Sequence, residues 1–169
     1  GIKLDYPGFA LHVALFDQTL DGFQSNVFTG TGFALANAGE QSTRGFELDS
    51  TINPTDALVF TFALTHLDPI YNSFTNSAVG DLTGTRPAGS PSFTIATSAT
   101  YTQELGSSGN LLIGRVDFYH ESDTQLIEGV PGFGTFEQQR AIARNYTREV
   151  NQVNASLTFA MENGFEVTG

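Results

Sequence analysis

The sequence predicts an all-β fold: an antiparallel up-and-down meander that is part of a large transmembrane β-barrel with short periplasmic turns and long extracellular loops. Two observations predict it. Apolar and polar residues alternate with period two along most of the chain. The connections between these segments alternate between short and long. This asymmetry is typical of outer-membrane barrels and unusual in soluble sandwiches.

Six long strands and two partial ones are expected from this alternation. The partial strands are the runs Ile2 to Tyr6 and Phe165 to Thr168 at the two ends of the chain. The window Phe136 to Arg148 is the best helical segment, although it lacks a clean apolar stripe. The six long strands correspond to the alternating segments 9–15, 46–52, 58–65, 93–102, 112–118 and 153–161.

The connections divide into two groups by length. The short ones carry the Gly, Pro and Asn residues that tight turns need. They are Tyr6 to Gly8, Asn53 to Asp56, Gly106 to Asn110, and Asn163 with Gly164. The long ones run from about Thr29 to Gly39, from Tyr71 to Ser90 and from Gln125 to Arg148.

The two strand faces differ in a way that suits a barrel wall. One face is rich in Phe, Leu, Val and Ile, and the other carries small polar residues, in a chain with only 15% charged residues. A wide barrel has a polar interior and an outer face that meets lipid. We therefore expect Phe60, Phe62, Leu157 and Phe159 to point outward and Thr61, Thr65, Ser156 and Thr158 inward.

Several aromatic residues fall near the expected strand ends. Two interpretations remain open for them: an aromatic girdle at the membrane surfaces, or ordinary core packing. The residues are Phe16, Tyr71, Phe74, Tyr101 and Tyr119.

Composition excludes several classes of function. The net charge of −11 leaves no basic surface for nucleic acid, and the absence of Cys excludes disulfides and thiol chemistry. His12, His66 and His120 have no partner at metal-ligand spacing, and no nucleophile motif occurs. We therefore expect no enzyme activity, no catalytic residues, no metal site and no cofactor.

Four segments, in order, resemble the TonB-dependent outer-membrane receptors, in the C-terminal part of the barrel domain. They are Asn37 to Glu47, Asn53 to Leu58, Thr65 to Tyr71 and Leu82 to Pro91. The resemblance implies that residues 1–169 are a fragment of that domain, without the plug domain and the TonB box. It also implies a wall segment of an active transporter in the outer membrane of a Gram-negative bacterium. A ferric siderophore or a similar scarce nutrient is the implied ligand.

The same resemblance implies the partners: outer-membrane lipid, the rest of the barrel and its plug, TonB through an N-terminal segment, and a small ligand such as a ferric chelate. Nucleic acid is not among them. Two alternatives remain: a self-assembling β-rich envelope or extracellular fragment without transport activity, pairing through open strand edges, and a small passive barrel.

The long connection from Gln125 to Arg148 is the candidate for ligand contact. Aromatic rings and arginines would suit an anionic iron chelate. The ordinary alternative is that the arginines pair with neighbouring carboxylates such as Glu137 and Glu149. The candidate residues are Phe133, Phe136, Arg140, Arg144 and Tyr146.

Overall fold

The computed structural model describes residues 1–28, 33–132 and 134–169, with the backbone alone at 26–28, 33–34 and 36–38. The protein is one antiparallel sheet of eight strands in the order of the sequence, from β1 to β8. The strands are β1 (Ile2–Tyr6), β2 (Phe9–Phe28), β3 (Phe33–Thr55), β4 (Leu58–Ser73), β5 (Phe93–Leu105), β6 (Asn110–Gln125), β7 (Thr147–Ala160) and β8 (Glu166–Thr168), with one helix, α1 (Phe136–Ala143).

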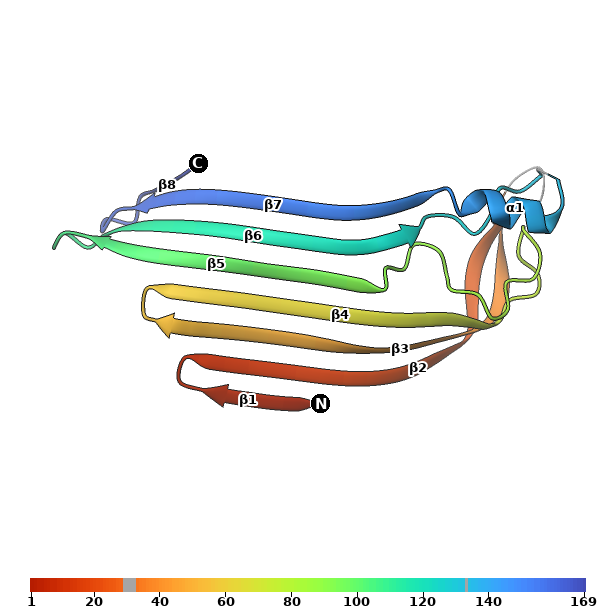
Figure 1. Ribbon diagram of the computed structural model, residues 1–169, viewed down its shortest axis with the longest axis horizontal. Helices are drawn as coiled ribbons and strands as arrows, with labels where there is room; N and C mark the ends of the chain where they lie inside the picture. Colours follow the sequence, from red (N-terminus) through yellow and green to blue (C-terminus); the bar gives the residue numbers. More distant parts are fainter. Residues whose placement is uncertain (29–32, 133) are drawn as a thin grey trace.

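Six strands are long and two are short, as the alternation predicted. The short turns lie at one end of the sheet, and the long connections gather with α1 at the other (Figure 1). This arrangement confirms the predicted meander with one compact end and one elaborate end.

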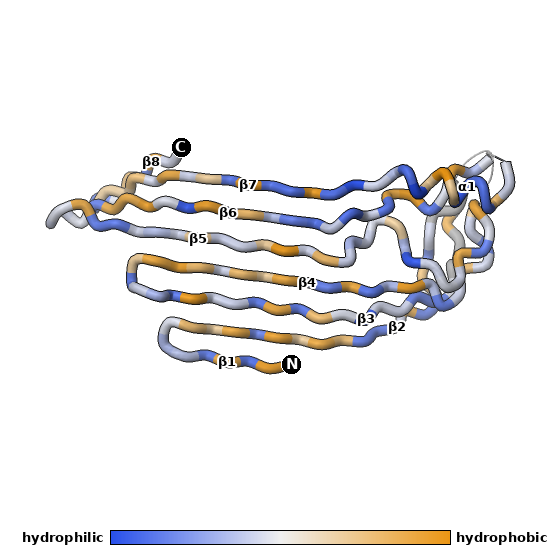
Figure 2. Tube along the Cα trace, in the orientation of Figure 1, coloured by the Kyte–Doolittle hydropathy of each residue, from blue (hydrophilic) through white to orange (hydrophobic). Residues whose placement is uncertain are grey.

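The two faces divide as predicted. Thr61 pairs with Thr51 on one side and with Ser98 on the other, and its hydroxyl lies 2.7 Å from that of Ser98. Phe62, the next residue, points to the opposite face. Figure 2 shows the resulting mixture of polar and apolar residues along each strand. Large apolar residues that are exposed lie almost entirely on the face of Phe62; among the described strand residues, Leu20 and Leu35 are the exceptions. The exposed residues that share the face of Phe62 are Ile2, Leu4, Tyr6, Leu15, Ile52, Phe60, Ile70, Phe93, Tyr101, Leu105, Val116, Val153, Leu157 and Val167.

The apolar band on this outer face lies lower on β6 and β7 than on the strands before them. Its upper edge is level from β2 to β5, where Leu15, Phe46, His66 and Phe93 form one register row, and it drops by four residues at β6. On β2 it ends at Leu15, before Asp17, whereas on β7 it ends at Val153, before Asn151. The register sets Val153 level with Leu11, four residues below Leu15, through the row Leu11, Ser50, Phe62, Thr97, Phe118, Val153. A descent of four residues at about 3.3 Å each, across five strand spacings of about 4.8 Å, corresponds to a strand tilt of roughly 30°. The strands of membrane barrels tilt by about 35–45° from the barrel axis, which is close to this value. With such a tilt, the apolar band would lie roughly parallel to the plane of the membrane.

The aromatic residues near the strand ends form neither a complete girdle on the outer face nor a single packed core. Tyr101 is half exposed on the outer face, where a girdle would lie, but Phe16 and Tyr119 are on the inner face. The aromatic row at the upper edge of the band is instead formed by Phe46, His66 and Phe93. The His66 ring has its centroid 5.4 Å from that of Phe46 and 4.5 Å from that of Phe93.

The prediction of a long connection from Thr29 to Gly39 is wrong over most of this range, because β2 runs to Phe28 and β3 already begins at Phe33. Residues 29–32 lie outside the described part. Two glycines with positive φ, Gly22 (66°) and Gly39 (96°), stand at or beside the register shifts in this hairpin. A bulge adds one residue to one strand and so interrupts the alternation that identifies a strand.

Candidate functional site

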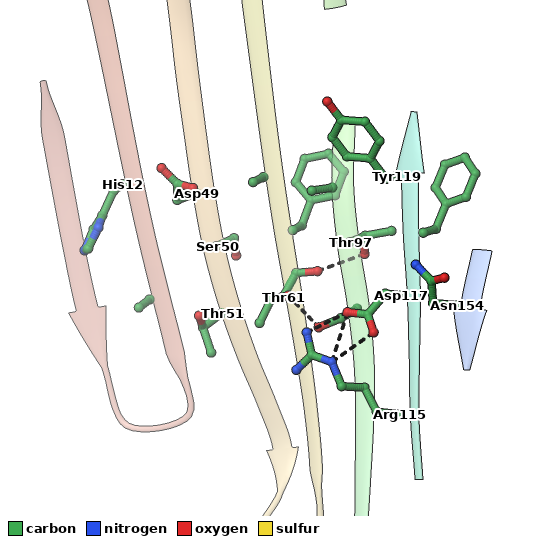
Figure 3. Close-up of a pocket in the computed structure, with 16 residues that line it drawn as sticks. His12, Asp49, Ser50, Thr51, Thr61, Thr97, Arg115, Asp117, Tyr119 and Asn154 are labelled. Atoms are coloured by element: carbon green, nitrogen blue, oxygen red, sulfur yellow. Dashed lines mark hydrogen bonds and ion pairs between the residues drawn. The ribbon is translucent and has the colours of Figure 1, made fainter. Parts of the chain in front are cut away.

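The inner face of the sheet is a polar surface of small side chains crossed by a few charges (Figure 3). A hollow of about 480 Å³ lies over it. Within this hollow the Arg115 guanidinium donates hydrogen bonds to Asp117, with a shortest distance of 2.6 Å. Because the ion pair is internal to β6, it leaves little net charge on this part of the surface.

Two histidines, which have no partner at ligand spacing in the sequence, have carboxylates nearby in space. His12 lies 3.5 Å from Asp5 on β1, and His120 lies 3.9 Å from Glu149 on β7. His66 is engaged through its Nδ1 with the carbonyl oxygen of Ser92 at 2.9 Å. Within the described ranges, no three of His, Cys, Asp or Glu gather in a metal-binding arrangement.

The most deeply buried cluster of apolar side chains lies among the long connections, at the elaborate end of the sheet. Tyr71, Phe74, Val79 and Leu82 are almost completely buried, and Phe23 of β2 packs on them. Phe23 stacks on Tyr71 with ring centroids 5.6 Å apart and contacts Phe74 edge-on at 5.8 Å. Tyr71 and Phe74 are therefore core residues of this loop cluster and do not belong to a membrane girdle.

The cluster lies on the inner side of the sheet. Tyr71 continues the period-two series of Thr61 along β4, and it pairs with Gln41 on the same face. The connection 74–92 therefore folds towards the interior of the curved wall. We call the connections 74–92 and 126–146 together the loop cap.

Glu128 joins the two halves of the loop cap. One carboxylate oxygen, Oε1, accepts a hydrogen bond from the Tyr71 hydroxyl at 2.9 Å and another from the Ala88 amide at 2.7 Å. The amide of Gly89 also donates to the carbonyl of Gln125 at 2.8 Å. Burial, together with the charge of Glu128 and the hydrogen bond to it, raises the pKa of Tyr71, so the phenol stays protonated as the donor. Tyr71 lies beyond the last β4–β5 pair, outside the apolar band.

Helix α1 packs on the other connection through a glycine. Its N-terminus is closed by a capping box in which Thr135 and Gln138 bond reciprocally to each other's backbone amides. A Cβ atom on Gly80 (φ 91°) would lie 2.8 Å from the Phe136 ring, so only glycine fits there. Arg140 donates from Nη1 to the carbonyl oxygen of Val79 at 2.8 Å.

The structure brings together only some of the residues predicted to contact a ligand. Phe136 and Arg140 both lie against the connection 74–92, although Phe136 is still 56% exposed. Arg144 and Tyr146 are exposed at the end of α1 and beyond it. Phe133 lies outside the described residues. The arginine–carboxylate pairs expected in the alternative interpretation also differ: Arg148 pairs with Glu121 at 2.8 Å, and Arg140 binds a carbonyl oxygen.

Between the two halves of the loop cap lies a hollow of about 610 Å³, which we call the cap hollow. Its lining is mainly apolar, and among its lining residues Glu128 is the one charged side chain. The sequence analysis did not single out Glu128, since an acidic residue in a long connection is most often solvated. Its one distinguishing signal is its position between Ile127 and Gly129 in an apolar run. The lining residues are Ser25, Tyr71, Phe74, Ser77, Ala78, Val79, Leu82, Ala88, Leu126, Ile127, Glu128, Gly129 and Pro131.

A family model described as "TonB dependent receptor-like, beta-barrel" matches residues 1–168 of the chain. The chain belongs to this family. No curated protein sequence matches it.

Among solved structures, the barrel segment resembles the ferric preacinetobactin receptor BauA of Acinetobacter baumannii with a TM-score of 0.66 and 15% sequence identity. The match covers 98% of this chain and 22% of BauA, so the chain spans about a fifth of the length of that receptor. At this identity the likeness shows the fold alone, an eight-stranded meander of the kind found in a receptor barrel.

TonB-dependent receptors are outer-membrane β-barrels of Gram-negative bacteria, and they act as receptors and transporters rather than enzymes. Receptors of this family interact in general with a ligand, a plug and TonB. In the described part of this chain, no helix has the length and hydropathy needed to cross a bilayer.

Proposed function

We propose that this chain is a wall segment of a TonB-dependent active transporter in the outer membrane of a Gram-negative bacterium. The single observation that carries the proposal is the apolar band on the outer face, whose drop of four residues between β2 and β7 agrees, on average, with tilted strands in a flat lipid layer. An inner face of small polar residues and a loop cap at one end complete the arrangement of such a wall. The family assignment supports the same conclusion.

A ferric siderophore or a similar scarce nutrient is the proposed ligand, and the loop cap is where this chain would first meet it. The fold match to a ferric preacinetobactin receptor supports this class of ligand. TonB and a plug domain are the proposed protein partners, through other parts of the receptor. Buried aromatic and apolar side chains at the mouth suit a bulky chelate better than a simple ion.

Uptake of radioactive iron tests the proposal directly. Cells that express the full-length receptor should accumulate ⁵⁵Fe from at least one of a panel of chelates, and this uptake should require TonB. A receptor that assembles in the outer membrane but supports no TonB-dependent uptake of any chelate or vitamin would contradict it.

A further inference from the structure

We propose that the cap hollow binds an apolar group that carries a hydrogen-bond donor, an amine or a hydroxyl, and that it rejects negatively charged groups. The inference rests on the proposed function, because it specifies the chemistry of a ligand that meets this mouth. It replaces the anionic ligand suggested by the arginines of the connection 125–148.

The size and lining of the cap hollow suit an apolar group. Its volume of about 610 Å³ falls within the range of about 300–1,000 Å³ typical of small-molecule sites. Leu126 and Ile127 offer apolar surface to it, and the almost completely buried Phe74, Val79 and Leu82 fix the apolar part of its wall by their own packing. Because this wall is already packed in the structure, a ligand would not have to order it on binding.

Glu128 supplies the polar contact. Its Oε1 is occupied by Tyr71 and Ala88, whereas its Oε2 has no hydrogen-bond partner among the described residues. The two donors hold the carboxylate in place, so Oε2 is a fixed acceptor at the edge of an apolar surface. A fixed anionic acceptor favours an ammonium or hydroxyl donor and repels a second carboxylate.

The arginines that would attract an anion do not line the cap hollow, and all but the exposed Arg144 among them are already bound. Arg140 donates to the Val79 carbonyl, and Arg148 pairs with Glu121 on the inner face of the sheet. Arg86 donates from Nη2 to the carbonyl oxygen of Leu67 at 2.7 Å. None of these three lines the cap hollow, and neither does Arg144.

The test uses three probes that share one phenyl group and differ in charge: 2-phenylethylamine, 2-phenylethanol and phenylacetate. Saturation-transfer NMR on the purified full-length receptor should detect binding of the amine and the alcohol. Phenylacetate should bind at least about ten-fold more weakly than the amine, because its carboxylate meets Glu128.

Three variants assign the signal to the cap hollow. Ala78→Trp fills it and should abolish binding of the amine and the alcohol, whereas Thr75→Trp, an exposed position of the same connection outside the lining, should not. Glu128→Gln keeps an oxygen that can accept from Tyr71 and Ala88 but removes the charge. It should therefore reduce the preference for the amine over phenylacetate.

The inference is overturned if phenylacetate binds as tightly as the amine, if Ala78→Trp leaves binding unchanged, or if no probe binds at all. Uptake of iron chelates by cells is measured separately from the binding of the three probes, so that the two proposals can fail independently. Uptake without the probe pattern would overturn this inference alone, and the probe pattern without uptake would overturn the proposed ligand class alone.

Discussion

The hydroxyl of Tyr71 donates a hydrogen bond to Oε1 of Glu128 at 2.9 Å, across 57 residues of sequence. Since the same oxygen accepts from Ala88, one carboxylate connects the end of β4, the connection 74–92 and the connection 126–146. The two connections therefore form a single packed unit, although they are far apart in the chain.

Removing this carboxylate should loosen the unit. Glu128→Ala leaves the Tyr71 hydroxyl and the Ala88 amide without their acceptor, at a cost of roughly 1–3 kcal/mol. Hydrogen exchange of the amides at 82–92 in the full-length receptor should become roughly ten-fold faster or more. Tyr119→Phe is the matched control, because it removes a similar tyrosine–glutamate bond, to Glu121, from the sheet. Equal exchange rates in Glu128→Ala and the parent would show that the carboxylate does not hold the cap.

The contact of α1 with Gly80 should tolerate no side chain. In Gly80→Ala, the new methyl group would meet the Phe136 ring, and the backbone would also be strained at φ 91°. Gly84→Ala carries the strain alone, because φ there is 80° and no atom lies within 4 Å of the added Cβ. We expect faster exchange over 136–143 in Gly80→Ala only. If the two variants affect α1 equally, the packing of Phe136 on Gly80 is not what holds the helix.

A charge placed on the outer face should destabilise the barrel much more than one placed on the inner face. Phe62→Arg would put a guanidinium into lipid, at a cost of about 2–4 kcal/mol near the midplane. Ala63→Arg, one residue along, points into the interior. Heat-modifiability on gels and urea unfolding of the full-length receptor should show the loss in Phe62→Arg. A larger loss in Ala63→Arg would mean that the faces are reversed.

Alkaline pH should open the loop cap through Tyr71. Its pKa is raised, so its contribution to stability is complete below the unfolded value of about 10 and is lost as the pH rises towards the folded value. In a titration of tyrosinate absorbance, the difference between the parent and Tyr71→Phe should be one tyrosine that ionises well above pH 10. If that tyrosine ionises near pH 10 instead, its burial against Glu128 is contradicted.

The sheet could be predicted because the residues of each strand alternate between apolar and polar types, according to the face on which they lie. Phe60, Thr61 and Phe62 predict the apolar outer face and the polar inner face without any knowledge of neighbouring strands. The hairpin of β2 and β3 was underestimated where Gly22 and Gly39 introduce bulges, since a bulge shifts the alternation by one residue.

The site could be predicted only in part, because its contacts are long-range. Nothing local to Arg140 shows that it binds Val79, 61 residues earlier, and nothing local to Glu128 shows its partners Tyr71 and Ala88. The helix is the exception: the window from Phe136 was the best helical segment of the sequence and α1 begins there, although it ends at Ala143, short of the expected Arg148.

The central claim is that one face of this sheet meets lipid and the other lines a channel, and single-cysteine spin labelling tests it most directly. This chain contains no Cys, so it supplies no thiol that would compete with a single cysteine placed at any of positions 58 to 65. Labels at the positions of Leu58, Phe60, Phe62 and Leu64 should be accessible to oxygen in lipid. Labels at those of Val59, Thr61, Ala63 and Thr65 should be accessible to a water-soluble nickel chelate or be immobilised by contacts in the interior. The two responses should alternate strictly with period two along β4. Uniform accessibility to the nickel chelate at all of these positions in the membrane-embedded receptor would contradict it.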